Sequence, residues 1–138
     1  MKILILNGPN LNRTGKREPG IYGSATMEIM LEEVRKTFSE DEIIYFQSNC
    51  EGSLIDRLQA VEDEGVEGVV FNAGAYTHTS VALLDCIRSL SIPVVEVHIS
   101  NIYAREEYRH RSLISAGCRG VVCGFGMKSY ELAIRALR

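Results

Sequence analysis

The hydrophobic positions of this chain follow two alternating patterns, short unbroken apolar runs and stripes at helical spacing. Residues 2–7 contain an unbroken apolar run from Ile3 to Leu6, which is typical of a parallel β-strand buried on both faces. Four later runs of the same kind predict strands at residues 42–46, 68–72, 93–98 and 120–123.

Between these runs, apolar residues recur at helical spacing. Residues 26–38 carry such a stripe, and Ser24 or Thr26 can cap its start with a side-chain oxygen. Further helices are expected at residues 53–64 with Gly65 as a stop, at residues 79–90 before Pro93, and at about residues 127–137.

Strands that alternate with helices, without an internal repeat or a linker, predict one domain over residues 1–138. The expected fold class is α/β, a three-layer α/β/α sandwich of flavodoxin-like topology. Its five-stranded parallel sheet should have the order 2-1-3-4-5, because crossover connections are right-handed and helices cover both faces. In such sheets the ligand lies beyond the carboxyl ends of the strands, so the residues there are the ones to inspect.

A long polar segment follows the first strand. It opens with Asn7 and Asn10 and covers about 17 residues, whereas βα connections usually span about 2–6. We therefore expect a lid over residues 13–24. No Lys-Ser or Lys-Thr follows suitably spaced glycines, so a phosphate-binding loop is not expected.

Polar side chains also follow the third and fourth strands. Asn72 and His78 come after the third strand, and Glu96, His98 and Ser100 alternate onto one face at the end of the fourth. A buried carboxylate is costly without a partner, so Glu96 is expected to pair with the imidazole of His98, to fix its tautomer and to raise its pKa. These residues predict a functional site.

Two nearby segments have a simpler interpretation. Ser80 is expected to cap the helix that follows His78. The charged residues 105–111 are interpreted as a solvated helix, from which one arginine can point back toward an anionic ligand.

Composition narrows the possible classes further. Hydrophobic residues make up 46% and charged residues 24% of the 138 residues, as in ordinary globular domains. Fifteen Lys and Arg stand against eighteen Asp and Glu, and no basic block accompanies the net charge of -3, so nucleic acid is not an expected partner. No apolar stretch is long enough for a membrane span or a secretory signal, and we expect a cytoplasmic protein without membrane association.

The cysteines and histidines give no sign of a metal site. The four cysteines include no C-x-x-C pair, and the three histidines are scattered along the chain. We interpret the cysteines as small buried hydrophobes in a reducing compartment, and we expect no metal.

The motifs at the strand ends, taken together, resemble one family over essentially the whole chain: the type II 3-dehydroquinate dehydratases, or 3-dehydroquinases. The resemblance rests on residues 5–12, 17–19, 22–23, 72–83, 96–101, 104–107 and Arg109. The sequence differs from the family pattern at Leu84, at Arg111 and after Ser115, where a basic residue, a histidine and a proline are usual.

The resemblance implies a hydro-lyase of the shikimate pathway, which serves chorismate and aromatic amino-acid biosynthesis. It would remove water from 3-dehydroquinate by anti elimination through an enolate, without metal or cofactor. Tyr22 would be the proton acceptor with Arg17 as its activator, Asn10 would stabilise the enolate, and His98 would be the proton donor with Glu96 behind it.

The resemblance also implies the binding residues and the assembly. Asn72 with the backbone of Ile99 and Ser100 would bind the substrate carboxylate, while His78 and Arg109 would bind the ring hydroxyls. Asp85 would reach the site of a neighbouring subunit, which implies a homo-oligomer, usually a dodecamer arranged as a tetramer of trimers.

Three other functions fit the sequence less well. The Schiff-base route of type I dehydratases needs a site lysine, and none of the four lysines ends an apolar strand inside a site motif. A hydrolase built on Ser80 or Ser100 would lack the G-x-S-x-G elbow. A flavodoxin-like binding or receiver module without catalysis remains as the alternative, although a receiver would need acidic residues where Asn7 and Asn72 stand.

Overall fold

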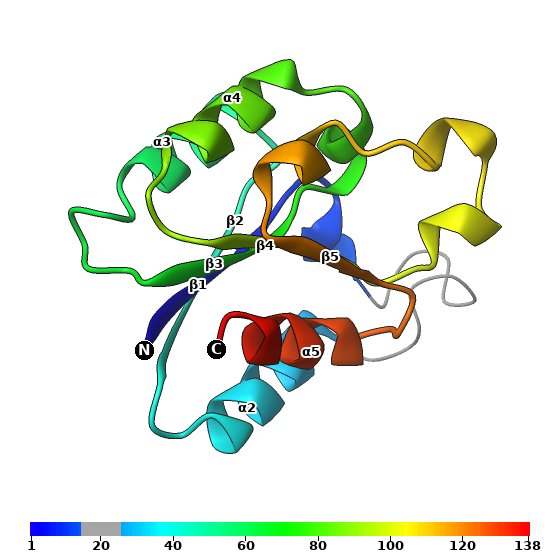
Figure 1. Ribbon diagram of the computed structural model, residues 1–138. Coiled ribbons are helices and arrows are strands. Elements are labelled where there is room, and N and C mark those ends of the chain that lie inside the picture. Colours follow the sequence, from blue (N-terminus) through cyan, green and yellow to red (C-terminus); the bar gives the residue numbers. More distant parts are fainter. Residues whose placement is uncertain (15–25) are drawn as a thin grey trace.

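A five-stranded parallel sheet forms the centre of the computed structural model, which describes residues 1–14 and 26–138 (Figure 1). The strands lie in the order β2-β1-β3-β4-β5, which confirms the predicted topology. All neighbouring strands run parallel, so their carboxyl ends meet at one edge of the sheet. The strands are β1 (Lys2–Asn7), β2 (Glu42–Gln47), β3 (Gly68–Asn72), β4 (Val94–His98) and β5 (Gly120–Cys123).

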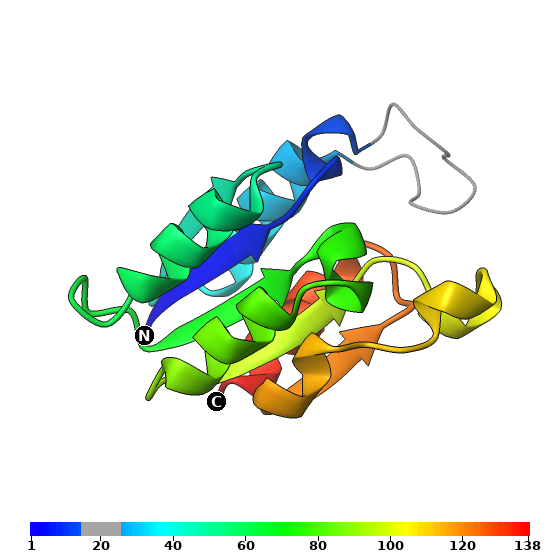
Figure 2. The same cartoon turned by 90° about the horizontal axis from the view of Figure 1, so that it is seen from above.

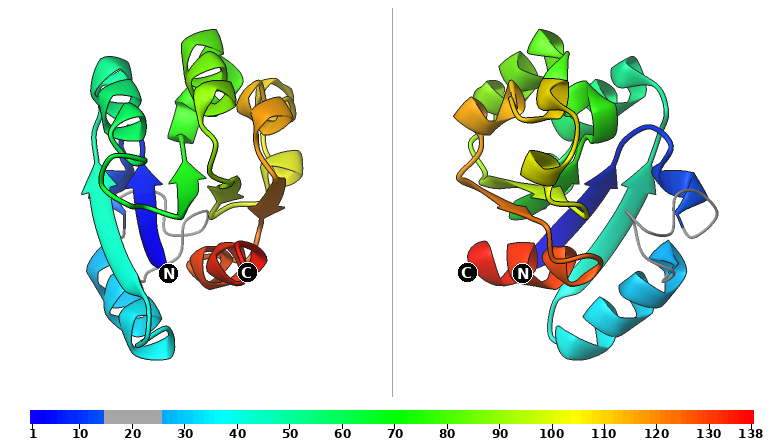
Figure 3. Two further views of the ribbon diagram at one scale, coloured as in Figure 1. Left: turned by 60° about the vertical axis from the view of Figure 1, so that its left-hand side comes forward. Right: turned by 90° about the vertical axis from the view of Figure 1, so that its right-hand side faces the viewer.

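Helices cover both faces of the sheet and make the three predicted layers. Figures 1 and 3 show α2 and α5 on one face and α3 and α4 on the other. The helices are α2 (Met27–Thr37), α3 (Glu51–Gln59), α4 (Val81–Ser89) and α5 (Lys128–Ala136).

The apolar run of β1 contributes to both sides of the core. Ile3 and Ile5 pack in the cluster under α2 and α5, whereas Leu4 and Leu6 pack in the cluster under α3 and α4. All four side chains are fully buried, and each such burial contributes about 1.5–3 kcal/mol. The unbroken run therefore reflects a strand that is buried on both faces.

Most helix ends follow the predicted signals. The side chains of Thr26 and Ser80 accept hydrogen bonds from the amides of Ile29 and Leu83 and so cap α2 and α4. The regular part of α3 lies earlier than predicted and ends at Gln59, because the chain continues from there in tighter turns. Gly65 closes those turns with a φ of 75°.

Short 3-10 helices connect the regular elements, and all but the last of them lie at the carboxyl edge of the sheet, on the right in Figure 2. They are η1 (Leu11–Arg13), η2 (Gly74–His78), η3 (Ile102–Ala104), η4 (Glu107–Arg109) and η5 (Ile114–Gly117). The prediction of one helix over residues 105–111 was wrong, because Arg105 is extended and separates η3 from η4. Of the lid expected at residues 13–24, only Arg13 and Thr14 belong to the described residues.

Candidate active site

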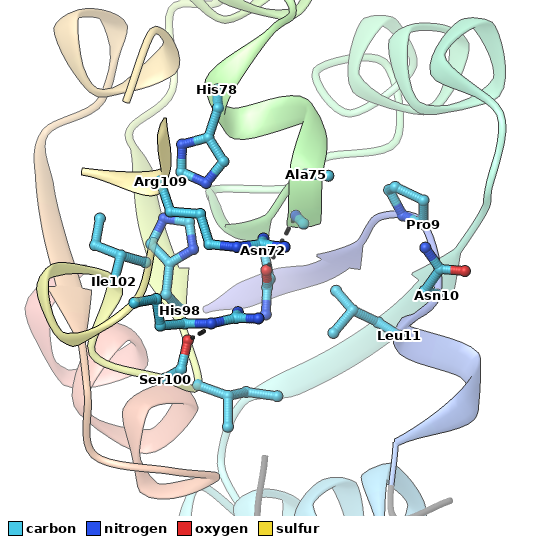
Figure 4. A pocket seen from close by; sticks show the side chains of 13 residues that line it. Pro9, Asn10, Leu11, Asn72, Ala75, His78, His98, Ser100, Ile102 and Arg109 are labelled. Atoms are coloured by element: carbon cyan, nitrogen blue, oxygen red, sulfur yellow. Dashed lines mark hydrogen bonds between the residues drawn. The ribbon is translucent and has the colours of Figure 1, made fainter. Parts of the chain in front are cut away.

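A pocket of about 110 Å³ opens at the carboxyl edge of the sheet, where Figure 4 shows its side chains converging. The backbone that follows β1, β3 and β4 supplies three of its walls, and the segment of η3 and η4 supplies the fourth. Its lining residues are Pro9, Asn10, Leu11, Asn72, Gly74, Ala75, His78, His98, Ile99, Ser100, Ile102, Arg105 and Arg109. The sequence patterns at three separate strand ends therefore meet in one place.

Glu96 and His98 form a buried pair at the end of β4. The Nε2 atom of His98 lies 2.6 Å from Oε2 of Glu96, and the carboxylate side chain is completely buried. Oε1 of Glu96 accepts a second hydrogen bond from Ser112 Oγ at 2.8 Å. We call Glu96, His98 and Ser112 the charged cluster. Because Nε2 faces the carboxylate, Nδ1 is the nitrogen that His98 can offer to a ligand.

His78, the last residue of η2, lies beside His98. The two rings are stacked with centroids 6.4 Å apart, and His78 Nδ1 lies 2.8 Å from the carbonyl oxygen of Arg111. A carbonyl only accepts, so Nδ1 carries the hydrogen. Partial burial lowers the pKa of His78 below its usual value, and the neighbouring His98 and Arg109 act in the same direction. The neutral ring thus leaves Nε2 as an acceptor for a hydroxyl group.

A second buried cluster lies beneath the pocket between β1, β3 and α5. Asn72 donates from Nδ2 to the hydroxyl of Tyr130 at 2.9 Å, and that hydroxyl donates to Oδ1 of Asn7 at 2.8 Å. Asn7 donates in turn to the hydroxyl of Tyr45 at 3.2 Å. We call Asn7, Tyr45, Asn72 and Tyr130 the neutral cluster. Burial raises the pKa of both phenols, so they stay protonated near neutral pH.

The loops after β1 and β3 touch, and this contact places Asn10 and Asn72 in one pocket. The amide of Gly8 donates to the carbonyl of Asn72 at 2.7 Å, and a Cβ atom on Gly8 would lie only 2.5 Å from the carbonyl oxygen of Ala73. Only glycine fits so close an approach. Asn10 then adopts a left-handed φ of 68°, which asparagine tolerates better than most residues.

Two arginines line the opposite wall. Arg109 donates from Nε to Glu106 Oε2 at 2.8 Å, and Figure 4 shows its guanidinium directed into the hollow. Arg105 donates from Nη1 to Ser100 Oγ at 3.4 Å, and only 11% of its side chain is exposed. Two guanidinium groups beside a small polar pocket favour an anionic ligand. Thus a chain of net charge -3 concentrates positive charge at one place.

The structure brings most of the predicted site residues together. The residues that line the pocket as expected are Asn10, Asn72, His78, His98, Ile99, Ser100 and Arg109. Glu96 lies behind His98, and Asp85 is exposed on α4 away from the lining of this pocket. Arg17 and Tyr22 lie outside the described residues.

Sequence analysis missed three residues of this region. Arg105 lines the pocket, although its place in a charged segment pointed to solvent. Ser112 and Tyr130 reach the site from segments that are distant in sequence. The one signal in the sequence was the expectation that an arginine of residues 105–111 points inward, and it did not say which arginine.

Within residues 1–14 and 26–138, no group of three or more His, Cys, Asp and Glu side chains has the arrangement of a metal site. Over the same residues, none of the helices has the length and apolar character that crossing a bilayer requires.

Comparison with known proteins gives a consistent answer. The family model described as dehydroquinase class II matches residues 1–138. A 3-dehydroquinate dehydratase from Rhizobium etli (strain CIAT 652) is 56% identical over 138 residues, which cover 99% of this chain and 94% of that protein.

Solved structures agree with this match. The type II dehydroquinase from Butyrivibrio crossotus DSM 2876 has a TM-score of 0.96 at 44% identity, with 99% of this chain and 97% of that chain covered. The type II dehydroquinase from Propionibacterium acnes has a TM-score of 0.92 at 40% identity, with 99% and 94% covered. These similarities extend over the strand ends that build the pocket, and they confirm the family that the motifs indicated: this chain belongs to the class II dehydroquinases.

Proposed function

We propose that this chain catalyses the reversible loss of water from 3-dehydroquinate to give 3-dehydroshikimate, as a type II dehydratase of the shikimate pathway. Its family membership and the names of its relatives support this activity. The observation that carries the chemistry is the charged cluster, because a buried carboxylate–imidazole pair opens directly onto a pocket beside two arginines. Such a pair suits proton transfer to a small anionic substrate.

His98 acts as the proton donor to the leaving hydroxyl group. Glu96 holds Nε2 of the imidazole and stabilises its protonated form, which leaves Nδ1 directed toward the pocket. A general acid must lie within hydrogen-bond reach of the group that it protonates, and the position of His98 in the lining of the pocket supports this assignment.

Tyr22 acts as the base that removes the proton next to the ketone, and Arg17 activates it. A phenol has a reference pKa of about 10, so nearby positive charge is needed to populate the phenolate. Both residues lie in the proposed lid, residues 13–24, and their assignment rests on the resemblance of their motifs to the family. Closure of that lid would exclude water from the reaction.

Asn10 stabilises the enolate that this proton removal creates, either directly or through a water molecule. Its side chain lines the pocket, and its backbone has a left-handed conformation. The backbone amide of Asn10 donates a hydrogen bond to Oδ1 of Asn49, after β2, at 3.0 Å, which holds this conformation in place. A fixed amide donor beside a developing oxyanion lowers the barrier because it needs no reorganisation.

The remaining lining residues bind the substrate. Asn72 and the backbone of Ile99 and Ser100 receive the carboxylate, while His78 and Arg109 bind ring hydroxyls. We add Arg105 to the carboxylate site, because its guanidinium contacts Ser100. A polyol acid offers many hydrogen-bonding groups and little apolar surface, and this lining matches that chemistry.

The proposed catalytic steps use only side chains, and no metal or cofactor takes part in them. The alternative of a flavodoxin-like binding or receiver module is not favoured, because relatives at more than half identity are named as dehydratases. A hydrolase is not favoured for the same reason.

We also propose a homo-oligomer, a dodecamer built as a tetramer of trimers, in which Asp85 of a neighbouring subunit completes each substrate site. Asp85 is exposed on α4, one turn beyond Val81, whose side chain is also exposed. An acidic residue that lies away from its own pocket is consistent with a role across an interface. Light scattering of the purified protein should give about twelve times the chain mass; a monomer would exclude this assembly.

A cytoplasmic location completes the proposal. Cys50, Cys86, Cys118 and Cys123 are all free thiols, which fits a reducing compartment.

The direct test of the activity is an assay of the purified protein with 3-dehydroquinate. The conjugated enone of 3-dehydroshikimate should appear as an ultraviolet absorbance. Addition of a chelator or of borohydride should leave the rate unchanged, since no metal or Schiff base takes part. Absence of product at high enzyme concentration would contradict the proposed function.

A further inference from the structure

The carboxylate of Glu96 is held from two sides by hydrogen bonds within the charged cluster. Oε2 lies 2.6 Å from His98 Nε2, and Oε1 accepts from Ser112 Oγ at 2.8 Å. The side chain of Glu96 is fully buried between strands β3 and β5, so solvent does not stabilise its charge. The hydroxyl of Ser112 therefore supplies a stabilisation that water would otherwise provide.

The surroundings of Ser112 direct its single hydroxyl hydrogen toward Glu96. The amide of Ser115 donates to Ser112 Oγ at 3.1 Å, which occupies an acceptor site of that oxygen. The hydroxyl of Ser115 donates to the backbone carbonyl of Ser112 at 3.2 Å and closes the same turn. With these positions fixed, the remaining interaction of the Ser112 hydroxyl is donation to the carboxylate.

The same short segment also holds the other histidine of the pocket. The carbonyl of Arg111 accepts from His78 Nδ1 at 2.8 Å, and the amide of Leu113 donates to the carbonyl of Thr77 at 2.9 Å. Ser112 thus lies in a segment that is anchored on both sides, and the backbone geometry that aims its hydroxyl is fixed independently of Glu96.

We propose that Ser112 is a positioning residue for the proton donor. Its hydrogen bond fixes the orientation of the Glu96 carboxylate and reduces its basicity, so that His98 is held in place yet can release its proton to the leaving hydroxyl. This inference deepens the proposed function and rests on the role of His98 as the acid. Ser112 does not touch the substrate; it acts through Glu96.

Several other charged or titratable groups face this pair among the described residues. His78 stacks on His98, and Arg105 and Arg109 line the pocket from the η3 and η4 segment. Cys118, after η5, has a pKa raised to about 12 by burial and by the charge of Glu96, so it is a neutral thiol at neutral pH. We expect all four to stay in place when only the hydroxyl of Ser112 is removed.

The test is the pH dependence of kcat for Ser112→Ala. Without the hydrogen bond, the carboxylate holds the imidazolium more strongly, so His98 becomes a weaker acid. We expect the pH above which kcat declines to move up by about one unit, and kcat below that pH to fall about threefold, because only part of a change in acidity appears in the rate. Titration of the ring nitrogens of His98 by NMR in the substrate-free protein should show the same upward shift.

Matched variants separate this role from a purely structural one. Ser112→Thr keeps the hydroxyl and should restore the wild-type pH profile. Ser115→Ala removes an identical group three residues away in the same turn, but it keeps the amide that fixes Ser112, and its profile should be unchanged. If Ser112→Ala does not fold, Ser112→Cys keeps the volume with a weaker donor and should show the shift in the same direction.

Three results would overturn the proposal: an unshifted profile in the folded Ser112 variant, an equal shift in Ser115→Ala, or a His98 titration that does not move. The NMR titration does not depend on turnover, so it stays informative even if the dehydratase assay of the wild type fails. Failure of that assay would count against the proposed function and not against the contact with Glu96.

Discussion

The two buried clusters at the carboxyl edge of the sheet differ in the chemistry that they place under the same pocket. The charged cluster at the end of β4 contains a carboxylate and an imidazole, both of which can change their protonation. The neutral cluster between β1, β3 and α5 contains amides and phenols, and burial keeps the phenols protonated. Burying charge is costly and burying satisfied amides is not, so the difference indicates that the first cluster serves proton transfer and the second serves positioning.

The largest effect that would sharpen this comparison concerns the base, which neither cluster supplies. Tyr22→Phe and Arg17→Ala should each lower kcat by about a hundredfold or more, because the phenolate and the charge that stabilises it are lost. Steady-state kinetics with circular dichroism as a control for folding would measure this. Near-normal turnover of Tyr22→Phe would show that another residue is the base, and the charged cluster would then be a candidate for it.

A smaller effect is expected from the neutral cluster. Tyr130→Phe removes the hydroxyl that bridges Asn72 and Asn7, so it leaves one buried donor and one buried acceptor without their partner. The free energy of unfolding should fall by about 1–3 kcal/mol. KM should rise about tenfold, because Asn72 loses its fixed position, while kcat stays within about threefold.

Tyr45→Phe is the matched control for that experiment. It removes a hydroxyl that contacts Asn7 and does not contact Asn72, so it should destabilise the fold without a comparable rise in KM. A Tyr130→Phe enzyme with normal KM and a much lower kcat would break the comparison, because the neutral cluster would then serve the chemical step.

The smallest expected change concerns stability in mild acid. Burial lowers the pKa of His78 from its usual 6.5 in the folded protein, so the unfolded chain binds more protons at acidic pH. The resulting stability is present above pH 6.5 and is lost as the pH falls through the folded pKa. Thermal unfolding of His78→Asn should therefore depend less on pH than that of the wild type between about pH 7 and 5. Equal pH dependence in the two proteins would contradict this assignment.

Local patterns were sufficient to predict much of the fold. The bounds of β1, β3 and β5 agree with the prediction, because unbroken apolar runs ended by polar or glycine residues leave little choice of register. The short 3-10 helix η4 in place of the helix expected over residues 105–111 was not predictable, because the extended conformation of Arg105 goes with a tertiary contact to Ser100 across η3.

The site shows the same division between local and distant contacts. The Glu96–His98 pair was predictable, because residues two apart in a strand share a face and a buried carboxylate needs a partner. The hydrogen bonds of Ser112 to Glu96 and of Tyr130 to Asn72 join residues that are 16 and 58 positions apart. A local sequence pattern does not predict such contacts. The inward direction of Arg105 depends on tertiary packing in the same way.

The most direct test of the account is the affinity of His98→Gln for 3-dehydroquinate, measured by calorimetry. This variant should turn over so slowly that binding can be measured without product formation. If the charged cluster serves proton transfer and the other lining residues serve binding, the Kd should lie within about threefold of the wild-type KM. Loss of measurable binding in a folded variant would contradict the division of roles between the two clusters.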